Sequence, residues 1–137
     1  MLKPYAYCPH CASPMKERLI NAVPHLACGA SSCDFVWWNN PVPVIAAIVQ
    51  WGDRIVLARN ASWPVGMYSM ITGFLDSGEH PEQALVRETK EELGLKVVRQ
   101  RFLGHYSFPA SNQILMAYWV TVKVRLAGAR NSQTSSC

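Results

Sequence analysis

The order of apolar and polar residues predicts β-strands through the middle of the chain, which has 137 residues. Residues 44–51 form a run that is apolar except for Gln50 and has several β-branched side chains, a pattern typical of a buried strand. Gly52 and Asp53 then favour a turn, so residues 54–58 read as the second strand of a hairpin. The same reasoning predicts further strands at residues 68–72, 97–106 and 114–124.

One helix is predicted at residues 81–93, after a loop at residues 73–78. Pro81 suits the first helical position, because the N–H that proline lacks would have no partner there. Glu82 favours the positive end of the helix, and Gly94 stops the helix as the glycine that follows its last turn. The pattern therefore predicts a helix with defined ends among the strands.

Five of the nine acidic residues of the chain lie within residues 79–92, on or next to this helix. Positions i, i+3 and i+4 share one face of a helix, so Glu88, Glu91 and Glu92 stand side by side. Each such like-charge pair destabilises a helix by roughly 0.2–0.5 kcal/mol unless a counter-charge is present. Clustered carboxylates also provide the oxygen ligands that Mg²⁺ prefers. The cluster alone leaves two interpretations open, a solvated acidic face and a divalent-metal site.

The spacing of the residues around the cluster distinguishes these interpretations. Residues 73–95 read G-x5-E-x7-R-E-U-x-E-E-x-G-U, where U is a bulky apolar residue, and this resembles the Nudix box of the Nudix hydrolases. The one departure is Thr89, where the family usually has an aliphatic residue, so we expect weaker packing there. All seven fixed positions that are not apolar match: Gly73, Glu79, Arg87, Glu88, Glu91, Glu92 and Gly94.

The resemblance implies a catalytic site with defined roles. Glu79 and Arg87 would form an ion pair that orients the box. The reaction would be hydrolysis of a nucleoside diphosphate linked to another group, with a metal that polarises the phosphates and activates water. The ligands of this Mg²⁺ or Mn²⁺ would be the backbone carbonyl of Gly73 and the carboxylates of Glu88, Glu91 and Glu92.

Two alternatives remain for the residue that acts as the base and takes the proton from the attacking water. Within the box, Glu91 or Glu92 would assist as the base. Some relatives instead use a glutamate on a later loop, which this chain is not expected to have.

The resemblance also implies an α+β fold, in which a mixed β-sheet and the box helix form part of an αβα sandwich. We expect this Nudix domain at residues 41–126. Nudix domains usually continue into another strand and a C-terminal helix, whereas residues 127–137 are small and polar and predict a disordered tail. Without that helix, one face of the sheet would expose apolar surface, which favours a homodimer.

Four cysteines near the start of the chain indicate a separate module at residues 1–40. Two close pairs, Cys8 with Cys11 and Cys28 with Cys33, match a four-thiolate zinc site. Two disulfides are the rival interpretation, but no secretory signal is recognisable, and a reducing cytoplasm favours zinc. Four protein ligands leave no open position, so the zinc would be structural.

We expect this zinc ribbon to depend on its metal for stability. A module of about 40 residues buries little apolar surface, so the ion must hold the module together. His10 lies inside the first cysteine pair and is an alternative ligand, although the tight turn there would point its side chain outward.

A zinc ribbon before a Nudix box resembles the branch of the family that contains the NADH pyrophosphatases. That branch carries the motif SQPWPFPxS after the box, and residues 108–111 match its second half, with Tyr106 in place of the tryptophan. The partial match implies a dinucleotide substrate, such as NADH, ADP-ribose or FAD, that releases AMP or another nucleoside monophosphate. Tyr106 and Phe108 would stack on a base, with Gln113 and Met116 in the same pocket; the alternative is that both aromatic rings are core residues.

The charge of the chain is compatible with this function. The formal net charge is +4, and the acidic residues are concentrated in the helix, so the remainder is more basic than the total indicates. This fits a small nucleotide with several phosphates, and we do not expect nucleic acid as the partner. No apolar stretch approaches the ~20 residues of a membrane span. Two other functions remain open, an inactive truncated remnant and a zinc-ribbon module that binds nucleic acid or protein, although a pure binder needs no clustered carboxylates.

Overall fold

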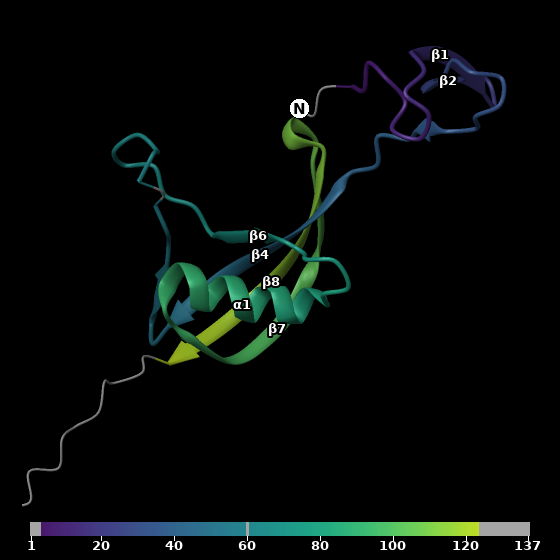
Figure 1. Cartoon of the computed structure of the whole chain (residues 1–137). Helices are drawn as coiled ribbons and strands as arrows, with labels where there is room; N and C mark the ends of the chain where they lie inside the picture. Colours follow the sequence, from purple (N-terminus) through teal and green to yellow (C-terminus); the bar gives the residue numbers. More distant parts are fainter. Residues whose placement is uncertain (1–3, 60, 124–137) are drawn as a thin grey trace, which may run out of the picture. The chain divides into compact units, whose positions relative to one another are not determined.

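The computed structural model describes residues 4–59 and 61–123, which fall into two compact units (Figure 1). The first unit contains residues up to Val42 together with Phe108–Gln113, and the second contains Pro43–Ser107 and the chain from Ile114 onwards. The predicted disordered tail and the question of a C-terminal helix concern residues that lie outside the described part of the chain.

The first unit contains a three-stranded antiparallel sheet in the order β1-β2-β3. Asn21 and Ala22 join β1 to β2, and both have positive φ, 50° and 64°, as a two-residue hairpin turn of this kind requires. The strands of this unit are β1 (Met15–Ile20), β2 (Val23–Cys28) and β3 (Val36–Trp37).

The apolar core of the first unit is small. Ala27 and Cys28 are buried, and the ring of Tyr5 packs edge-on against the rings of Phe35 and Trp37, with centroids 6.3 and 6.0 Å apart. A core of this size gives a module little stability of its own, as the sequence leads us to expect.

The second unit is built on a five-stranded sheet. Strand β4 lies inside the sheet, with β8 on one side and both β5 and β6 on the other, and β7 lies beyond β8. A short 3₁₀ turn, η1 (Pro109–Ser111), joins β7 to β8. The strands are β4 (Val42–Trp51), β5 (Arg54–Val56), β6 (Ile71–Phe74), β7 (Lys96–Phe108) and β8 (Gln113–Lys123).

The core of this unit lies between the sheet and helix α1 (Pro81–Leu93). Ile45 and Ala47 of β4 are fully buried, as are Val120 of β8 and Leu85 of α1. Alternate strand residues point to the same face, so Ile45 and Ala47 lie together on the face that the helix covers. Figure 1 shows α1 lying along this sheet, which confirms the predicted α+β class.

Both predicted ends of the helix are confirmed. The backbone N–H of His80, the residue before the helix, donates to Gln83 Oε1 at 3.0 Å. Gly94 has a φ of 66°, and its N–H donates to the carbonyl of Lys90 at 2.9 Å. Of the helices in the described part of the chain, none combines the length and the apolar character that crossing a membrane requires.

Thr89, the departure from the family pattern, is fully buried in α1. Its hydroxyl donates to the carbonyl oxygen of Leu85, one turn earlier, at 2.7 Å. The hydroxyl of Thr89, which stands where an aliphatic side chain is usual, therefore has a hydrogen-bond partner in the core.

Three predicted strand boundaries are wrong near the box, and one of them is the start of the strand predicted at residues 68–72, which begins at Ile71 as β6. Strand β5 ends at Val56, and Ala58 forms only an isolated bridge with Ser69. Gly73 lies in β6, paired with Ile45, and not in the loop that was expected to start there. A glycine can keep its backbone in the sheet at a point where another group approaches closely, which the apolar pattern does not reveal. The other three predicted strands are confirmed as β4, β7 and β8.

Candidate active site and metal centre

Arg87 of α1 is the centre of a network of charged side chains. Its Nε and Nη2 donate to the two carboxylate oxygens of Glu79 at 3.0 and 2.8 Å, the bidentate geometry of strong guanidinium–carboxylate pairs. Its Nη1 donates to Glu88 at 2.8 Å and to Glu91 at 3.4 Å. Its Nη2 also donates to the carbonyl oxygen of Phe74 at 3.0 Å, which ties the helix to β6. Arg87 thus supplies the counter-charge that neighbouring glutamates on one helix face require.

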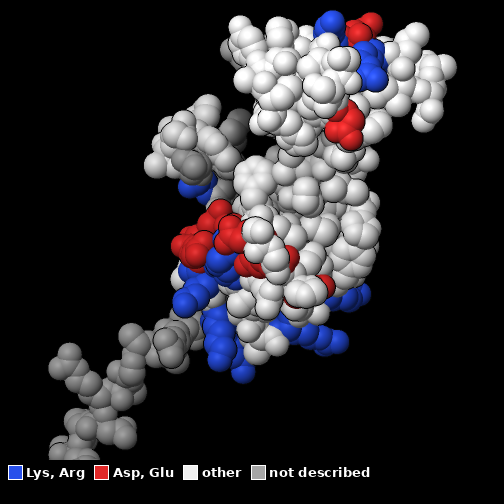
Figure 2. Space-filling view, turned by 45° about the vertical axis from the view of Figure 1, so that its right-hand side comes forward, with Lys and Arg blue, Asp and Glu red and all other residues white. Residues whose placement is uncertain are grey.

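This network is partly shielded from solvent. The side chains of Glu79, Arg87 and Glu88 are 14%, 27% and 15% exposed, and Figure 2 shows acidic and basic side chains gathered together on the surface. The backbone N–H of Asp76 donates to Glu79 at 3.0 Å. The hydrogen bonds from Arg87, followed by the one from Asp76, lower the pKa of Glu79 to about 2. Hydrogen bonds to Glu79 and then to Glu88 raise the pKa of Arg87, so the pair stays charged at neutral pH.

Glu92 is not part of this network. Among residues 4–59 and 61–123, no ion pair includes Glu92. Its side chain lines a cavity of about 480 Å³. Burial, followed by the negative charge of Glu88, raises the pKa of Glu92. Of the three glutamates on this helix face, Glu88 and Glu91 contact Arg87 and Glu92 does not, while Glu91 lines a separate cavity of about 580 Å³.

Gly73 brings the backbone of β6 against the carboxyl group of Glu88. A Cβ at residue 73 would overlap the Glu88 carboxyl group, so only glycine leaves room for it. The sequence predicts that the carbonyl of Gly73 and the carboxylate of Glu88 share a metal. The structure places these two residues in direct proximity, and their role as ligands stays a prediction.

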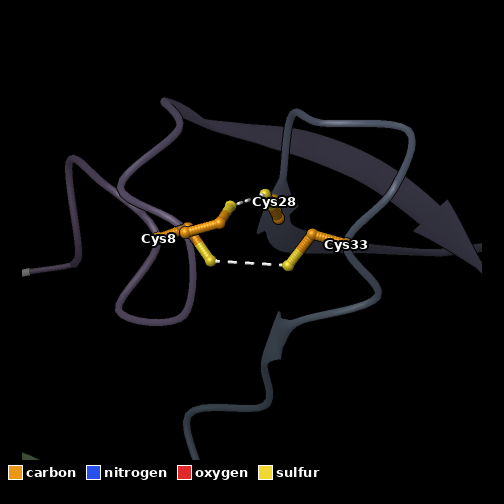
Figure 3. A group of neighbouring side chains, drawn as sticks. Cys8, Cys28 and Cys33 are labelled. Atoms are coloured by element: carbon orange, nitrogen blue, oxygen red, sulfur yellow. Dashed lines mark hydrogen bonds between the residues drawn. The ribbon is translucent and has the colours of Figure 1, made fainter.

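The four cysteines of the first unit converge on one point. All four sulfur atoms lie within 4.8 Å of one another, and Figure 3 shows Cys8, Cys28 and Cys33 pointing toward a common centre. The sulfur atoms of Cys8 and Cys33 are 3.8 Å apart, and those of Cys11 and Cys28 are 3.4 Å apart. Each of these contacts joins the first cysteine pair to the second, so both pairs contribute to one site.

The sulfur geometry fits a zinc ion and does not fit disulfides. A disulfide needs about 2.0 Å between its sulfur atoms, and all four cysteines are free. Four thiolates in a tetrahedron at about 2.3 Å from zinc lie about 3.8 Å from one another, close to the observed spacing. Within the described ranges, these cysteines are the one group of three or more potential ligands that approach so closely. The ring of His10 packs against Phe35, with centroids 4.8 Å apart.

The predicted base-binding residues are divided between the two units. Tyr106 belongs to the second unit, whereas Phe108 and Gln113 belong to the first. Tyr106 is 54% exposed and Phe108 is 45% exposed, so neither ring is a buried core residue. Their role in binding a base stays a prediction.

Sequence reasoning missed the cavity next to Glu92, together with Arg59 and Trp63, which also line it. Both residues lie in the segment between the strands predicted at residues 54–58 and 68–72, which the apolar pattern leaves without structure. A basic and an aromatic residue in a connecting loop just before the box are a signal that could have identified them.

Comparisons with known proteins identify the domain. The profile of the NUDIX domain family matches residues 40–136. The chain is 32% identical over 114 residues to the NAD-capped RNA hydrolase NudC of Chromobacterium violaceum, a match that covers 83% of this chain and 42% of that protein. It is also 32% identical over 121 residues to the mitochondrial NAD(P)H pyrophosphatase NUDT13 of Homo sapiens, covering 87% of this chain and 33% of that protein.

The solved structures agree on the fold. A NUDIX hydrolase from Nitrosomonas europaea matches with a TM-score of 0.74 and 24% sequence identity, over 88% of this chain and 69% of that chain. The chain spans less than half the length of the two curated relatives described above.

The substitution Gly73→Ala tests the close approach between β6 and the helix. The added Cβ would overlap the Glu88 carboxyl group, so we expect a loss of about 1–3 kcal/mol in the free energy of unfolding. In a Glu88→Ala background, the same change should cost less than about 1 kcal/mol, because the overlapping group is gone. Urea denaturation of the four proteins measures both costs. Equal costs in the two backgrounds would show that Glu88 does not lie against residue 73.

Proposed function

Because the chain belongs to the Nudix hydrolase family, we propose that it cleaves the pyrophosphate bond of a nucleoside diphosphate linked to another group. The substrate is a dinucleotide such as NADH, ADP-ribose or FAD, and AMP or another nucleoside monophosphate is released. The observation that supports this best is the arrangement of Gly73, Glu88 and Arg87 at the start and centre of the box. The activities for which the two relatives are named, NAD-capped RNA hydrolase and NAD(P)H pyrophosphatase, favour a pyrophosphate flanked by nucleosides.

The donor set suits a hard divalent cation. Mg²⁺ and Mn²⁺ prefer oxygen ligands, which glutamate carboxylates and a backbone carbonyl provide. When bound, such an ion supplies Lewis-acid polarisation of the phosphates and a more acidic water. The residues that would hold it are Gly73, through its carbonyl, and Glu88, Glu91 and Glu92.

The residues of the box have separate roles in positioning the ligands and in accepting a proton. Arg87 positions Glu88 through a hydrogen bond of 2.8 Å, while its bidentate pair with Glu79 fixes the guanidinium. Both Glu91 and Glu92 line cavities, but Glu91 is engaged by Arg87 at 3.4 Å, whereas no ion pair among the described residues includes Glu92. Glu92 is therefore better placed than Glu91 to accept a proton from a water molecule beside the substrate.

The cysteine site of the first unit supports a structural role for zinc. Cys8, Cys11, Cys28 and Cys33 would complete a tetrahedral site that leaves no position for substrate. Thiolates held in this way require a reducing compartment, so we propose that the protein works in the cytoplasm.

The metal assignment at the box predicts the behaviour of two glutamine variants. Glu91→Gln and Glu92→Gln should each lose about 2–5 kcal/mol of transition-state stabilisation in Mg²⁺-dependent hydrolysis, because each removes a charged oxygen ligand. Thermal unfolding should change little. Glu17→Gln, on the exposed face of β1, is the matched control and should keep full activity. Turnover within threefold of the unmodified protein in both variants would refute the assignment.

The zinc assignment predicts one tightly bound Zn²⁺ per chain. Elemental analysis of protein purified under reducing conditions should find it, and Cys33→Ser should lose it, because a thiolate ligand is removed. Chelation should expose residues 1–40 to proteolysis before it affects the rest of the chain. Cys137→Ser is the control, since this cysteine is not one of the four ligands. Protein without zinc that resists proteolysis equally well would contradict the assignment.

If Tyr106 stacks on a base, its removal should weaken substrate binding and leave the stability of the protein unchanged. If the ring of Tyr106 stacks on a base, Tyr106→Ala should raise KM for a dinucleotide by roughly 5- to 150-fold, from about 1–3 kcal/mol of stacking. The melting temperature should stay the same, since this ring is half exposed. A lowered melting temperature with an unchanged KM would assign Tyr106 to structure alone.

A further inference from the structure

A cavity of about 480 Å³ opens beside the end of the box helix, within the second unit. Its volume lies in the range of small-molecule sites, which is about 300–1,000 Å³. Its lining includes Arg59, Trp63 and Glu92 of the box. A glutamate of the Nudix box thus shares a cavity with one cationic and one large aromatic side chain.

The segment between β5 and β6 is held in place at its base. Ala58 and Ser69 exchange two backbone hydrogen bonds, each 2.9 Å long, so the ends of the excursion lie next to each other. Arg59 Nη2 donates to the carbonyl oxygen of Trp63 at 3.2 Å, which links the two cavity-lining residues. Compact excursions with closed ends are a frequent location of binding residues.

The side chains of this cavity match the parts of a nucleotide. Trp63 keeps 36% of its surface exposed, so the indole has free surface on which a base can stack. The Arg59 guanidinium is exposed and can bind phosphate oxygens through further N–H groups beyond the one used for Trp63. Glu92 stands at the box side of the cavity, where the bond to be cleaved would lie.

We propose that Arg59 and Trp63 bind the nucleoside-phosphate half of the substrate, with Trp63 stacking on the base and Arg59 contacting the phosphate next to it. This inference rests on the proposed function, because Glu92 belongs to the metal-binding set that the function assigns. A dinucleotide has two bases, and the cavity takes one of them. Arg59 and Trp63 then determine which nucleotides bind, while the box performs the hydrolysis.

The test measures binding directly, by isothermal titration calorimetry with ADP-ribose and with inorganic pyrophosphate. The full chain is used without added Mg²⁺, so that hydrolysis does not interfere. Trp63→Ala should weaken ADP-ribose binding roughly 5- to 150-fold and leave pyrophosphate binding unchanged, because pyrophosphate has no base. Trp63→Phe, which keeps an aromatic ring, should restore most of the affinity.

Arg59→Gln removes the positive charge but keeps an N–H donor for the carbonyl of Trp63. It should weaken both ADP-ribose and pyrophosphate about tenfold or more, as expected for a lost charge-assisted contact. Trp51→Ala, at the β4–β5 turn, and Arg101→Ala, on β7, are matched controls that should bind both probes within twofold of the unmodified protein.

Three results would overturn the proposal: unmodified protein that binds no ADP-ribose, Trp63→Ala that binds it within twofold of the unmodified protein, or an equal loss in Trp51→Ala. Thermal melting of each variant identifies a loss caused by unfolding, and Trp63→Phe then decides the case. Failure of the proposed function has a different signature, in which ADP-ribose binds with the predicted pattern of losses but no AMP appears when Mg²⁺ is added.

Discussion

The arrangement of the candidate active site depends on the guanidinium of Arg87. Adjacent carboxylates on one helix face repel one another, and Arg87 opposes that repulsion by contacting Glu88 and Glu91 while it holds Glu79 in a bidentate pair. Its additional bond to the carbonyl oxygen of Phe74 links the helix to β6. One side chain therefore couples the charge balance of the box to the docking of the helix on the sheet. A lysine could not replace it, because a single ammonium group lacks the planar set of donors.

The strand beside the helix imposes the second constraint. Gly73 remains paired with Ile45 in the sheet, yet the missing side chain leaves room for the Glu88 carboxyl group. Glu88 is thereby held between the backbone of β6 and Arg87. This geometry explains why a glycine and an arginine, 14 residues apart in the chain, act on the same carboxylate. It also leaves Glu92 outside the ion-paired set, on the side of the cavity.

The sequence predicts those features that depend on local spacing and fails where distant segments meet. The two ends of the helix, marked by Pro81 and Gly94, follow from backbone chemistry within a few residues. The cysteine site follows from ligand spacing. The extension of β6 through Gly73 could not be predicted, because it depends on pairing with Ile45, which lies far away in the sequence. Arg59 and Trp63 were missed for a related reason, since only the folded chain brings their loop next to Glu92.

The two candidate metal sites lie in units with different cores. The four cysteines lie in a unit with a small core, whereas the carboxylates of the box belong to a unit with its own larger apolar core. We propose that the second unit performs metal-dependent hydrolysis of a dinucleotide. This is tested by measuring the release of AMP from a panel of dinucleotides, including NADH, ADP-ribose and FAD, by the purified protein with and without Mg²⁺. We expect release from at least one of them that requires Mg²⁺. Folded, zinc-loaded protein that releases AMP from none of them at any Mg²⁺ concentration would contradict it.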